Sequence, residues 1–244
     1  RASLPTIKHL LLSGAKRIVL ISHLGRPVIL SRERLELIIS GNSGLILDKV
    51  AQKLSDWLKT KVKITKEQIE GMELPAYKIS DKLYLMENIR FLEGEGKNDP
   101  TLSKKLASLG DIFINDAFAA SHRVHASIVG IADFLPSYAG LLLEKEVDQL
   151  SQLIKKPEHP FVLILGGAKI ADKILLLKNL IKKVDFVLLG GVMANTFLKT
   201  RNIDIKKSTY EEKCLNMAQD IFDSASRKII LPTDIVWDNE KIVD

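Results

Sequence analysis

Short apolar runs alternate along the chain with longer segments in which apolar residues recur every three or four positions. The runs predict strands, because they are short and rich in valine, isoleucine and leucine, as are strands buried in parallel sheets. They lie at residues 17–22, 62–65, 82–87, 111–115, 161–165, 185–189 and 228–231. The longer segments predict amphipathic helices at residues 4–12, 45–58, 101–109, 138–154, 170–181 and 211–225, and Gly190 and Gly191 open a further helix. This alternation predicts an α/β fold with parallel sheets.

The predicted helix at residues 138–154 divides the chain into two parts. Two prolines follow it within residues 155–160, and prolines of this kind mark a boundary. We therefore expect a first domain at residues 1–137, a linking helix at residues 138–156 and a second domain at residues 157–244. An ordinary crossover helix within one sheet is the alternative. Because three strands make a thin sheet, we expect the second domain to be incomplete.

Two segments between these elements show no clear period. Residues 28–44 mix charged and apolar residues and end in a cluster of glycine, asparagine and serine, which predicts an irregular connection. Residues 66–75 are rich in charge, which predicts a solvated helix or loop. Residues 161–165, by contrast, are so uniformly apolar that we expect them to form a central strand of their sheet.

Composition argues against several classes of protein. No apolar run approaches the ~18 residues that a membrane-spanning helix needs, and no signal-peptide pattern is present. The single cysteine, Cys214, excludes an internal disulfide and is ordinary in a reducing compartment, so we expect a cytoplasmic protein. The net charge is +6, but the lysines are spread along the chain and aromatic residues are only 6%. We therefore expect a small acidic substrate and neither nucleic acid nor a membrane as partner.

A glycine pair followed by two lysines suggests a phosphate site. Gly166 and Gly167 follow the strand at 161–165 and let the backbone turn sharply and approach a ligand. Lys169 and Lys173 are four residues apart and share one face at the start of the next helix. Two ammonium groups beside a helix N-terminus favour a polyanion such as phosphate. A packed strand–turn–helix with two solvated lysines is the alternative.

A second glycine turn, at Gly190 and Gly191, opens another predicted helix. Its small residues offer a surface on which a planar base or a ribose can lie. Close packing between helix and strand explains the same glycines equally well.

Basic residues follow three of the predicted strands. They are His23 and Arg26 after the strand at 17–22, Arg90 after that at 82–87 and Arg123 after that at 111–115. Because the carboxyl ends of parallel strands lie along one edge of a sheet, these side chains can converge on one pocket. Arginine binds phosphate or carboxylate through its bidentate fork, so the pattern predicts an anion pocket. The alternatives are separate surface arginines in salt bridges and a structural histidine at position 23.

Two further histidines, His122 and His125, do not favour a zinc site. Nothing near them supplies further ligands, and Cys214 is remote in the sequence. Arg123 lies between the two histidines and argues for an anion instead.

Several motifs follow one another in a fixed order. They are SHLGRP at 22–27, ENIRF at 87–91, NDAF at 115–118 with HRVHAS at 122–127, LGGAKIADKI at 165–174 and GGVMANTFLK at 190–199. In this order they resemble the phosphoglycerate kinase family very closely, over essentially the whole chain. The resemblance implies two Rossmann-like parallel-sheet domains joined by a long helix. It also implies that the first domain binds the triose acid, that the second binds the nucleotide, and that the two close about a hinge.

The resemblance implies roles for particular residues. Contacts to the triose acid carry over to His23, Leu24, Gly25, Arg26, Arg90 and Arg123. Contacts to the nucleotide phosphates carry over to Gly167, Lys169 and Lys173, with Gly190 and Gly191 near the nucleoside. Lys173 and Arg123 are the expected catalytic residues.

The implied activity is the glycolytic transfer of a phosphoryl group between 1,3-bisphosphoglycerate and ADP to give 3-phosphoglycerate and ATP. No general base is required, because the attacking carboxylate or phosphate is already ionised at neutral pH. The implied enzyme is a cytoplasmic monomer without a metal site of its own, since Mg²⁺ is carried with ATP or ADP. A dinucleotide dehydrogenase is not favoured, because no G-x-G-x-x-G follows any predicted strand.

The chain departs from the family's pattern mainly at its two ends. The opening Val-Asp-Phe-Asn-Val-Pro strand and a substrate-binding arginine are absent before Arg1, and the Gly-Gly-Asp-Thr nucleotide loop and the carboxyl-terminal helix are absent after Asp244. We therefore expect an internal part of the enzyme. A catalytically inactive fragment that retains only partial anion or nucleotide binding is the alternative. Val192, Ala119 and Ser121 are smaller departures, which we expect to be tolerated.

Overall fold

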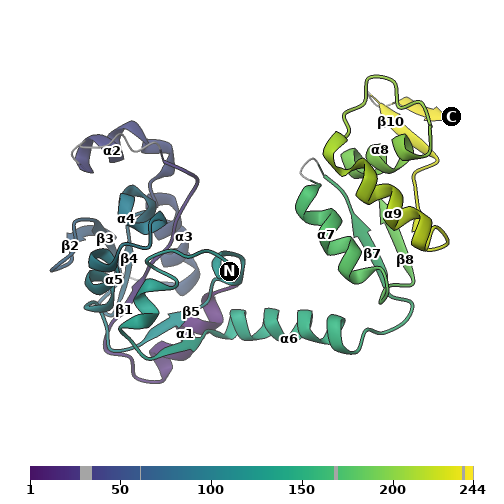
Figure 1. Cartoon of the computed structure of the whole chain (residues 1–244). Coiled ribbons are helices and arrows are strands. Elements are labelled where there is room, and N and C mark those ends of the chain that lie inside the picture. The colour runs from purple at the N-terminus through teal and green to yellow at the C-terminus, as the bar shows by residue number, and fades with distance from the viewer. Residues whose placement is uncertain (28–34, 61, 168–169, 238–239, 244) are drawn as a thin grey trace. The chain divides into compact units, whose positions relative to one another are not determined.

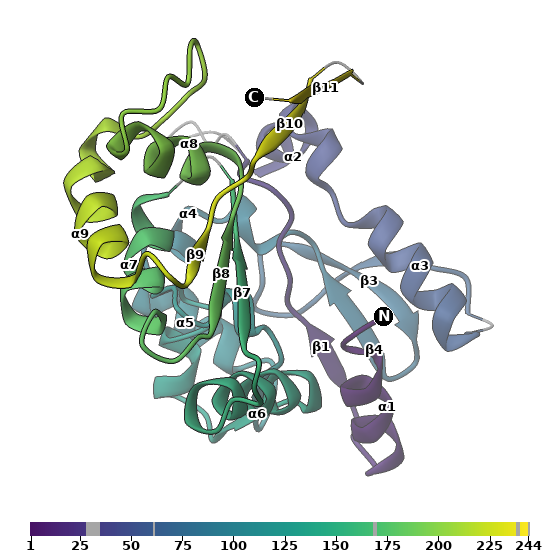
Figure 2. The same cartoon turned by 90° about the vertical axis from the view of Figure 1, so that its right-hand side faces the viewer.

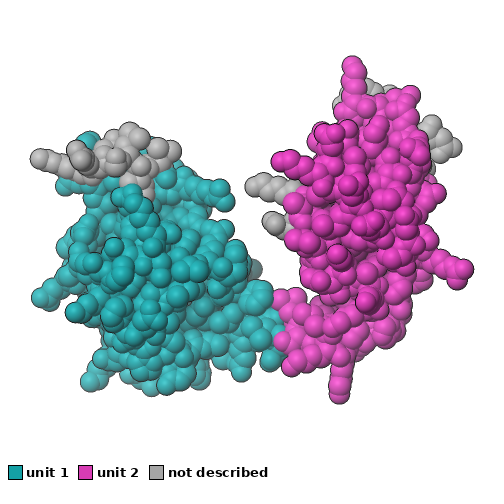
Figure 3. All heavy atoms as spheres, viewed as in Figure 1, with its two compact units in different colours: residues 1–149 teal, residues 150–244 magenta. Residues whose placement is uncertain are grey.

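The computed structural model describes residues 1–27, 35–60, 62–167, 170–237 and 240–243 (Figure 1). The chain divides into two compact units, Arg1–Gln149 and Leu150–Asp244 (Figure 3). The division falls inside α6 (Leu141–Lys155). None of the described helices is long and apolar enough to cross a membrane. The functions expected for residues 1–137, 138–156 and 157–244 stay predictions.

The first unit is built on a four-stranded sheet in the order β1-β4-β3-β2. Its strands are β1 (Ile18–Leu20), β2 (Thr65–Gln68), β3 (Pro75–Ser80) and β4 (Leu83–Met86). β1 and β4 run parallel, with Val19 opposite Tyr84, whereas β3 runs antiparallel to both of its neighbours. A separate parallel pair joins β5 (Phe113–Asn115) to β6 (Ser137–Ala139). The larger sheet is therefore mixed, which the expectation of parallel strands did not include.

The prediction of a solvated helix or loop at residues 66–75 is confirmed only as a loop at residues 69–74, since residues 66–68 belong to β2 and residue 75 begins β3. Ile69, Met72 and Leu74 of this loop are buried and not solvated. The strand expected at residues 62–65 is displaced into β2. Its sequence, TKEQ, is mostly exposed and carries charge, as edge strands often do, so no alternation of apolar residues marks it. β3 runs back along β4 because only Asp81 and Lys82 separate the two strands.

The long predicted helices of the first unit are confirmed to within a few residues at their ends. They are α1 (Leu4–Leu12), α3 (Asp48–Leu58), α5 (Pro100–Ala107) and α6. Shorter elements lie between them: α2 (Leu35–Gly41), α4 (Glu93–Gly96), η1 (Ser43–Leu45), η2 (Ile89–Phe91), η3 (Phe118–Ala120) and η4 (Gly130–Asp133). α2 contradicts the irregular connection expected at 28–44, of which residues 28–34 lie outside the described part. α6 begins at Leu141 and not at residue 138, because residues 137–139 pair with β5.

Apolar residues pack on both faces of the four-stranded sheet. One cluster includes Met86, Ile89, Phe91, Leu102 and Leu106, and the other includes Ile7, Leu47, Leu54, Ile79 and Leu85. Because successive side chains of a strand point to opposite faces, Leu85 and Met86 of β4 enter different clusters. Burial on both faces fixes β4, and β4 leads directly into the ENIRF motif.

The second unit is built on a parallel sheet in the order β7-β8-β9, whose strands run alongside one another in Figure 2. Its strands are β7 (Val162–Leu165), β8 (Phe186–Leu189) and β9 (Ile229–Ile230), and its helices are α7 (Ala171–Leu180), α8 (Gly191–Thr200) and α9 (Leu215–Ala225), with the turn η5 (Glu212–Cys214) before α9. One core joins them and includes Ile174, Leu177, Val187, Phe197 and Ala218. These elements are confirmed. An antiparallel hairpin, β10 (Asp234–Trp237) with β11 (Glu240–Val243), was not predicted.

The prediction that residues 161–165 form a central strand is wrong for the described sheet. β7 lies at its edge and β8 in the middle. Ile164 is 74% exposed, whereas Val187 of β8 is fully buried. The prediction failed because an apolar run indicates a strand whose faces suit burial and does not tell how many strands flank it.

Candidate functional site

Two loops that carry predicted site residues are held together at the carboxyl ends of β1 and β4. Three hydrogen bonds join them: Ile89 N–H to the Ser22 carbonyl at 3.1 Å, Asn88 Nδ2 to the Leu24 carbonyl at 2.8 Å, and Arg90 Nη1 to the Gly25 carbonyl at 2.5 Å. The two ends meet because β1 and β4 are parallel neighbours. The structure therefore brings residues 22–26 and Arg90 together, as the strand ends predicted.

Four basic side chains gather around these loops, and we call them the cation cluster: His23, Arg26, Arg90 and Arg123. Burial, and then the charges of Arg90 and Arg123, lower the pKa of His23. Burial, and then the charge of Arg123 and less that of Arg26, lower the pKa of Arg90, while Glu95 acts in the opposite sense on both groups. The positive charges that lower the pKa values of His23 and Arg90 mark a positive surface, on which an anion would relieve the repulsion.

The arginines of the cation cluster are not distributed among surface salt bridges. Among the residues that the structure describes, no carboxylate forms an ion pair with Arg26, Arg90 or Arg123. The alternative of separate, salt-bridged arginines therefore receives no support. The ligand contacts expected for His23, Leu24, Gly25, Arg26, Arg90 and Arg123 stay predictions.

Glu95 holds the loop that carries Arg123. Its buried carboxylate accepts the N–H of Ser127 at 2.9 Å and the hydroxyl of Ser127 at 2.6 Å, and it lies 3.4 Å from Nδ1 of His125. Its carbonyl accepts the N–H of Ala126 at 3.0 Å. Sequence reasoning missed this residue, because nothing in the segment distinguishes it from Glu93, which is exposed.

Glu87 and Asn88 of the ENIRF motif are both fully buried. The Glu87 carboxylate accepts four donors: Leu47 N–H at 2.8 Å, Tyr77 hydroxyl at 2.7 Å, Asn88 N–H at 2.9 Å and Lys66 Nζ at 3.2 Å. Burial and the hydrogen bond to Glu87 strongly raise the pKa of Tyr77, which therefore remains a neutral donor. The motif was recognised from the sequence, but only Arg90 within it was singled out. The signal available in the sequence was a pair of polar residues at the end of a predicted strand.

Asp116 of the NDAF motif caps α6. Its Oδ1 accepts the N–H of Leu142 at 2.9 Å and that of Leu143 at 3.2 Å. Gly140 leaves room for this contact, since a Cβ there would lie 2.2 Å from the same oxygen. The Thr6 hydroxyl accepts the N–H of Leu141 at 3.1 Å, so three N–H groups of the first turn have side-chain partners.

The two glycine turns of the second unit contact one another. Gly167 and Gly191 have positive φ values of 109° and 58°, which side chains other than glycine rarely adopt. A Cβ on Gly166 would lie 3.3 Å from the carbonyl oxygen of Gly190, and one on Gly191 would lie 3.2 Å from the nitrogen of Gly167. Backbone geometry and close packing therefore favour glycine at positions 166, 167 and 191 whether or not a nucleotide binds. The nucleoside contacts of Gly190 and Gly191 stay a prediction.

The lysines predicted for the phosphate site are placed only in part. Lys173 lies in the first turn of α7, and its ammonium group donates to the carbonyl of Gly166. It therefore reaches the first glycine turn. Lys169 lies outside the described residues, so its shared face with Lys173 stays a prediction.

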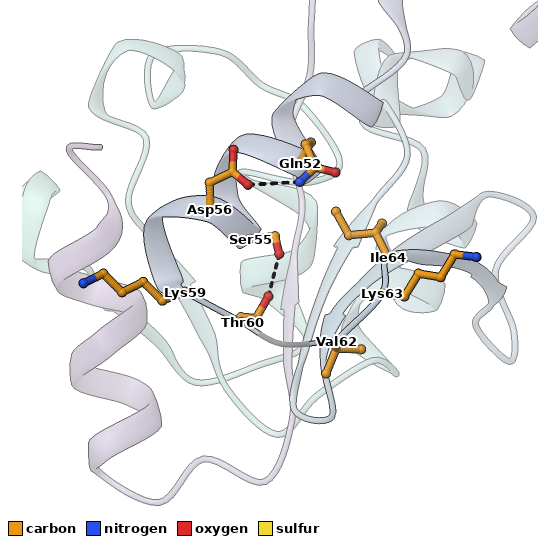
Figure 4. A pocket seen from close by; sticks show the side chains of 8 residues that line it. All are labelled: Gln52, Ser55, Asp56, Lys59, Thr60, Val62, Lys63 and Ile64. Atoms are coloured by element: carbon orange, nitrogen blue, oxygen red, sulfur yellow. Dashed lines mark hydrogen bonds between the residues drawn. The ribbon is translucent and has the colours of Figure 1, made fainter.

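A pocket elsewhere in the first unit adjoins the carboxyl end of α3 (Figure 4). It is lined by Gln52, Ser55, Asp56, Lys59, Thr60, Val62, Lys63 and Ile64. Gln52 bonds to Asp56, and Ser55 bonds to Thr60, so four of its polar side chains are paired with each other. No residue predicted for a site lines it. Within the described ranges, no group of three or more histidine, cysteine or acidic residues is placed to hold a metal ion.

Comparison with known proteins gives a consistent result over the whole chain. The family model described as phosphoglycerate kinase matches residues 1–243. A phosphoglycerate kinase of Coprothermobacter proteolyticus is 43% identical over 245 residues, which are 98% of this chain and 60% of that protein. One of Wolinella succinogenes is 45% identical over 241 residues, or 97% of this chain and 57% of its own length. The chain thus spans about 60% of the length of these relatives.

Solved structures agree with the sequence comparison. Phosphoglycerate kinase from Coxiella burnetii aligns with a TM-score of 0.74 and 35% identity, covering 99% of this chain and 60% of that one. The enzyme from Pyrococcus horikoshii aligns with a TM-score of 0.77 and 29% identity, covering 100% of this chain and 62% of that one. The motif order, the α/β fold and these matches together show that the chain belongs to the phosphoglycerate kinase family.

Proposed function

We propose that this chain provides ligand-binding residues of a phosphoglycerate kinase, which transfers a phosphoryl group between 1,3-bisphosphoglycerate and ADP to give 3-phosphoglycerate and ATP. The cation cluster is the observation that carries this proposal. Its four basic side chains come from loops of the SHLGRP, ENIRF and HRVHAS motifs and have no ion-pair partner within the described part of the chain. A substrate with a phosphate and a carboxylate supplies the anions that such a cluster binds.

On the triose side, we assign His23, Arg26, Arg90 and Arg123 to the phosphate and carboxylate groups, with Leu24 and Gly25 forming the backbone of the pocket. Arg123 also acts on the reacting group. Because the nucleophile is already ionised, the protein has no proton to remove. Its contribution is to position the reactants and to neutralise charge.

On the nucleotide side, we assign Gly167, Lys169 and Lys173 to the phosphates and Gly190 and Gly191 to the surroundings of the nucleoside. Lys173 neutralises the transferring phosphoryl group; its ammonium group reaches the glycine turn in support of this role. Mg²⁺ arrives with ATP or ADP and adds further neutralisation of phosphate charge. The proposed enzyme acts as a cytoplasmic monomer on small molecules.

A second candidate function is binding without turnover. It is favoured by one observation, namely that the chain spans about 60% of the length of its relatives. On this view the cation cluster and the glycine turns bind anions or nucleotide only in part, and no phosphoryl transfer follows.

Calorimetry with 3-phosphoglycerate and, separately, with MgADP, beside a coupled turnover assay, distinguishes these functions. Turnover supports the kinase, binding without turnover supports the second candidate, and binding of neither ligand overturns both. Arg123→Gln should weaken binding of 3-phosphoglycerate by about tenfold or more, because a hydrogen bond to a charged group is worth about 1.5–3 kcal/mol. Lys104→Gln on α5 removes the same charge from an exposed site and is the matched control. Equal affinities for the two variants would remove Arg123 from the site.

A further inference from the structure

Asn88 uses its whole side-chain amide to join three segments of the first unit. Its Nδ2 donates to the carbonyl of Leu24 at 2.8 Å and to that of Leu45 at 2.9 Å. Its Oδ1 accepts the N–H of Arg90 at 3.2 Å. The residue is fully buried, so leaving its amide without hydrogen-bond partners would be costly.

The loop that carries His23 and Arg26 depends on these bonds. Its carbonyls at Ser22, Leu24 and Gly25 are all fastened to the segment of residues 88–90. The central bond comes from the side chain of Asn88. Without it, the loop would keep one backbone bond and one bond from the exposed Arg90 guanidinium.

Repulsion among the positively charged side chains of the cation cluster opposes the fastening of this loop to residues 88–90. Besides burial, the charges of Arg90 and Arg123 lower the pKa of His23, and the charge of Arg123 lowers the pKa of Arg90, so like charges repel in the cluster. A mobile loop would relax by moving His23 and Arg26 away from the other arginines. The neutral, buried amide of Asn88 opposes this movement without adding charge of its own.

Asn88 is itself held firmly. Its N–H donates to the Glu87 carboxylate, which also accepts the N–H of Leu47 at the start of α3 and the hydroxyl of Tyr77 in β3. The amide therefore projects from a backbone that is fixed to a helix and to a neighbouring strand. Such a network can set the position of a loop more narrowly than a surface contact can.

We propose that Asn88 is a positioning residue of the cation cluster, which holds the His23–Arg26 loop against Arg90 so that the anion pocket is formed before the anion arrives. This rests on the proposed function, since a phosphorylated acid is the ligand that the pocket would take. Asn88 does not touch the ligand. Its effect is on the fraction of molecules whose loop is ready to bind, and the apparent affinity falls in proportion to that fraction.

The variants Asn88→Ala and Asn88→Leu test the proposal in the whole chain. Both remove the side-chain hydrogen bonds without adding charge, and the second keeps approximately the volume of the side chain. Ile79→Val is the control, because Ile79 is equally buried and lies in the core cluster that includes Ile7 and Leu85. Circular dichroism establishes a temperature at which all variants are folded. Loss of folded structure in both Asn88 variants at every temperature would assign Asn88 to global stability and overturn the proposal.

The first measurement is a pH titration of the His23 ring by NMR. In both Asn88 variants the pKa of His23 should rise toward the ordinary value for histidine, because the ring leaves its partly buried place beside Arg90 and Arg123. The other charged groups that act on it are Glu95 and His125, and neither is changed. Ile79→Val should leave the titration where it is. An unchanged His23 pKa in folded Asn88 variants would overturn the proposal.

The second measurement is the affinity for inorganic phosphate and for 3-phosphoglycerate. If the ready conformation falls to about a tenth of the population, both affinities should fall about tenfold in the Asn88 variants. Equal weakening in Ile79→Val would overturn the positioning role. If the unsubstituted chain binds neither anion, the proposed function fails, but the His23 titration still decides whether Asn88 positions the loop.

Discussion

The carboxylate of Asp116 accepts the backbone N–H of Leu142 at 2.9 Å and so caps α6 from a loop that follows β5. The NDAF motif thereby connects the strand pair β5–β6 to the start of the long helix. The other carboxylate oxygen of Asp116, Oδ2, is buried and has no hydrogen-bond partner among the described residues. The contact therefore fixes the helix in place through one oxygen, at some cost in desolvation of the other.

Asp116→Ala should lower the free energy of unfolding by about 0.5–2 kcal/mol, as other losses of helix caps do. The reason is that the N–H groups of Leu142 and Leu143 lose their acceptor. Urea unfolding followed by circular dichroism measures the change. Asp148→Ala, on an exposed position of the same helix, is the control and should stay within about 0.5 kcal/mol of the unsubstituted chain. Equal losses for the two variants would show that the cap contributes nothing specific.

Glu95→Ala should lower the free energy of unfolding by about 1–3 kcal/mol, because it leaves the buried N–H and hydroxyl of Ser127 without an acceptor. It should also weaken binding of 3-phosphoglycerate, because the loop that carries Arg123 is released. Denaturant unfolding and calorimetry measure the two effects. Glu93→Ala breaks only an exposed pair with Lys97 and should change the stability by about 0.5 kcal/mol or less. A stable Glu95→Ala chain with unchanged anion affinity would contradict the assigned role.

The hydrogen bonds of Asp116 and Glu95 could not be predicted from the sequence. Apolar periodicity is a local property, so it located the helices α1, α3, α5 and α6 and the strands whose ends carry basic residues. The partners of Asp116 and Glu95 lie 26 and 32 residues away along the chain, and no local pattern records such pairs. The donors to such an acid can be identified only once the fold has brought them together.

The order and direction of the strands could be predicted from the sequence only in part. The meeting of residues 22–26 with Arg90 could be predicted, because it requires only that two parallel strands be neighbours. The antiparallel course of β3 and the polar edge strand β2 could not. β2 has no alternation of apolar residues, and the short alternation of β3 does not tell the direction of the strand. The glycine turns were located from the sequence, whereas the mutual contact of Gly166 and Gly190 depends on β7 and β8 being adjacent.

The stability of the first unit should depend on pH through His23. Burial and the nearby arginines lower the pKa of His23 in the folded state, so the unfolded chain binds more protons between the two pKa values. Above the pKa of the unfolded chain, His23 is neutral in both states and does not reduce the free energy of unfolding. As the pH falls toward the lower pKa of the folded state, the unfolded chain binds more protons, so the free energy of unfolding falls. His23→Gln should raise the stability relative to the unsubstituted chain at acidic pH and leave it nearly unchanged at about pH 8, above the ordinary histidine range.

Unfolding free energies measured at several pH values check this prediction. His9, on the exposed side of α1, gives the control variant His9→Gln, which removes an imidazole from outside the cation cluster. Parallel pH profiles for His23→Gln and the unsubstituted chain would contradict the prediction. Added phosphate should reduce the difference between the two chains at acidic pH, because an anion in the cation cluster favours the protonated ring.

Lys173→Met should weaken binding of MgADP and, in any form of the protein that turns over, lower kcat by about 100-fold or more, as is typical when a group that stabilises transition-state charge is removed. Stability should change little, because the bond of Lys173 to the Gly166 carbonyl is exposed. Lys178→Met, in the last turn of the same helix, removes the same charge and should leave both the MgADP affinity and kcat unchanged. Unaltered turnover in Lys173→Met would remove this lysine from the reaction.

The adjacent glycines Gly190 and Gly191 should respond differently to alanine. Gly191 has a positive φ of 58°, and a Cβ there would lie 3.2 Å from the backbone nitrogen of Gly167, so Gly191→Ala should cost about 1–2 kcal/mol in the free energy of unfolding. Gly190 has an extended backbone, and a Cβ there would meet nothing within 4 Å. Its replacement should cost about 0.5 kcal/mol, from a poorer cap on α8.

Denaturant unfolding of Gly191→Ala and Gly190→Ala separates backbone geometry from ligand binding at this turn. If the glycines serve packing alone, MgADP affinity should follow stability and fall only in Gly191→Ala. If a nucleoside lies against the turn, Gly190→Ala should also weaken MgADP binding, because its new methyl group occupies space that the protein leaves open. A stable Gly190→Ala chain with unchanged MgADP affinity would therefore favour the packing explanation and remove Gly190 from the proposed nucleotide site.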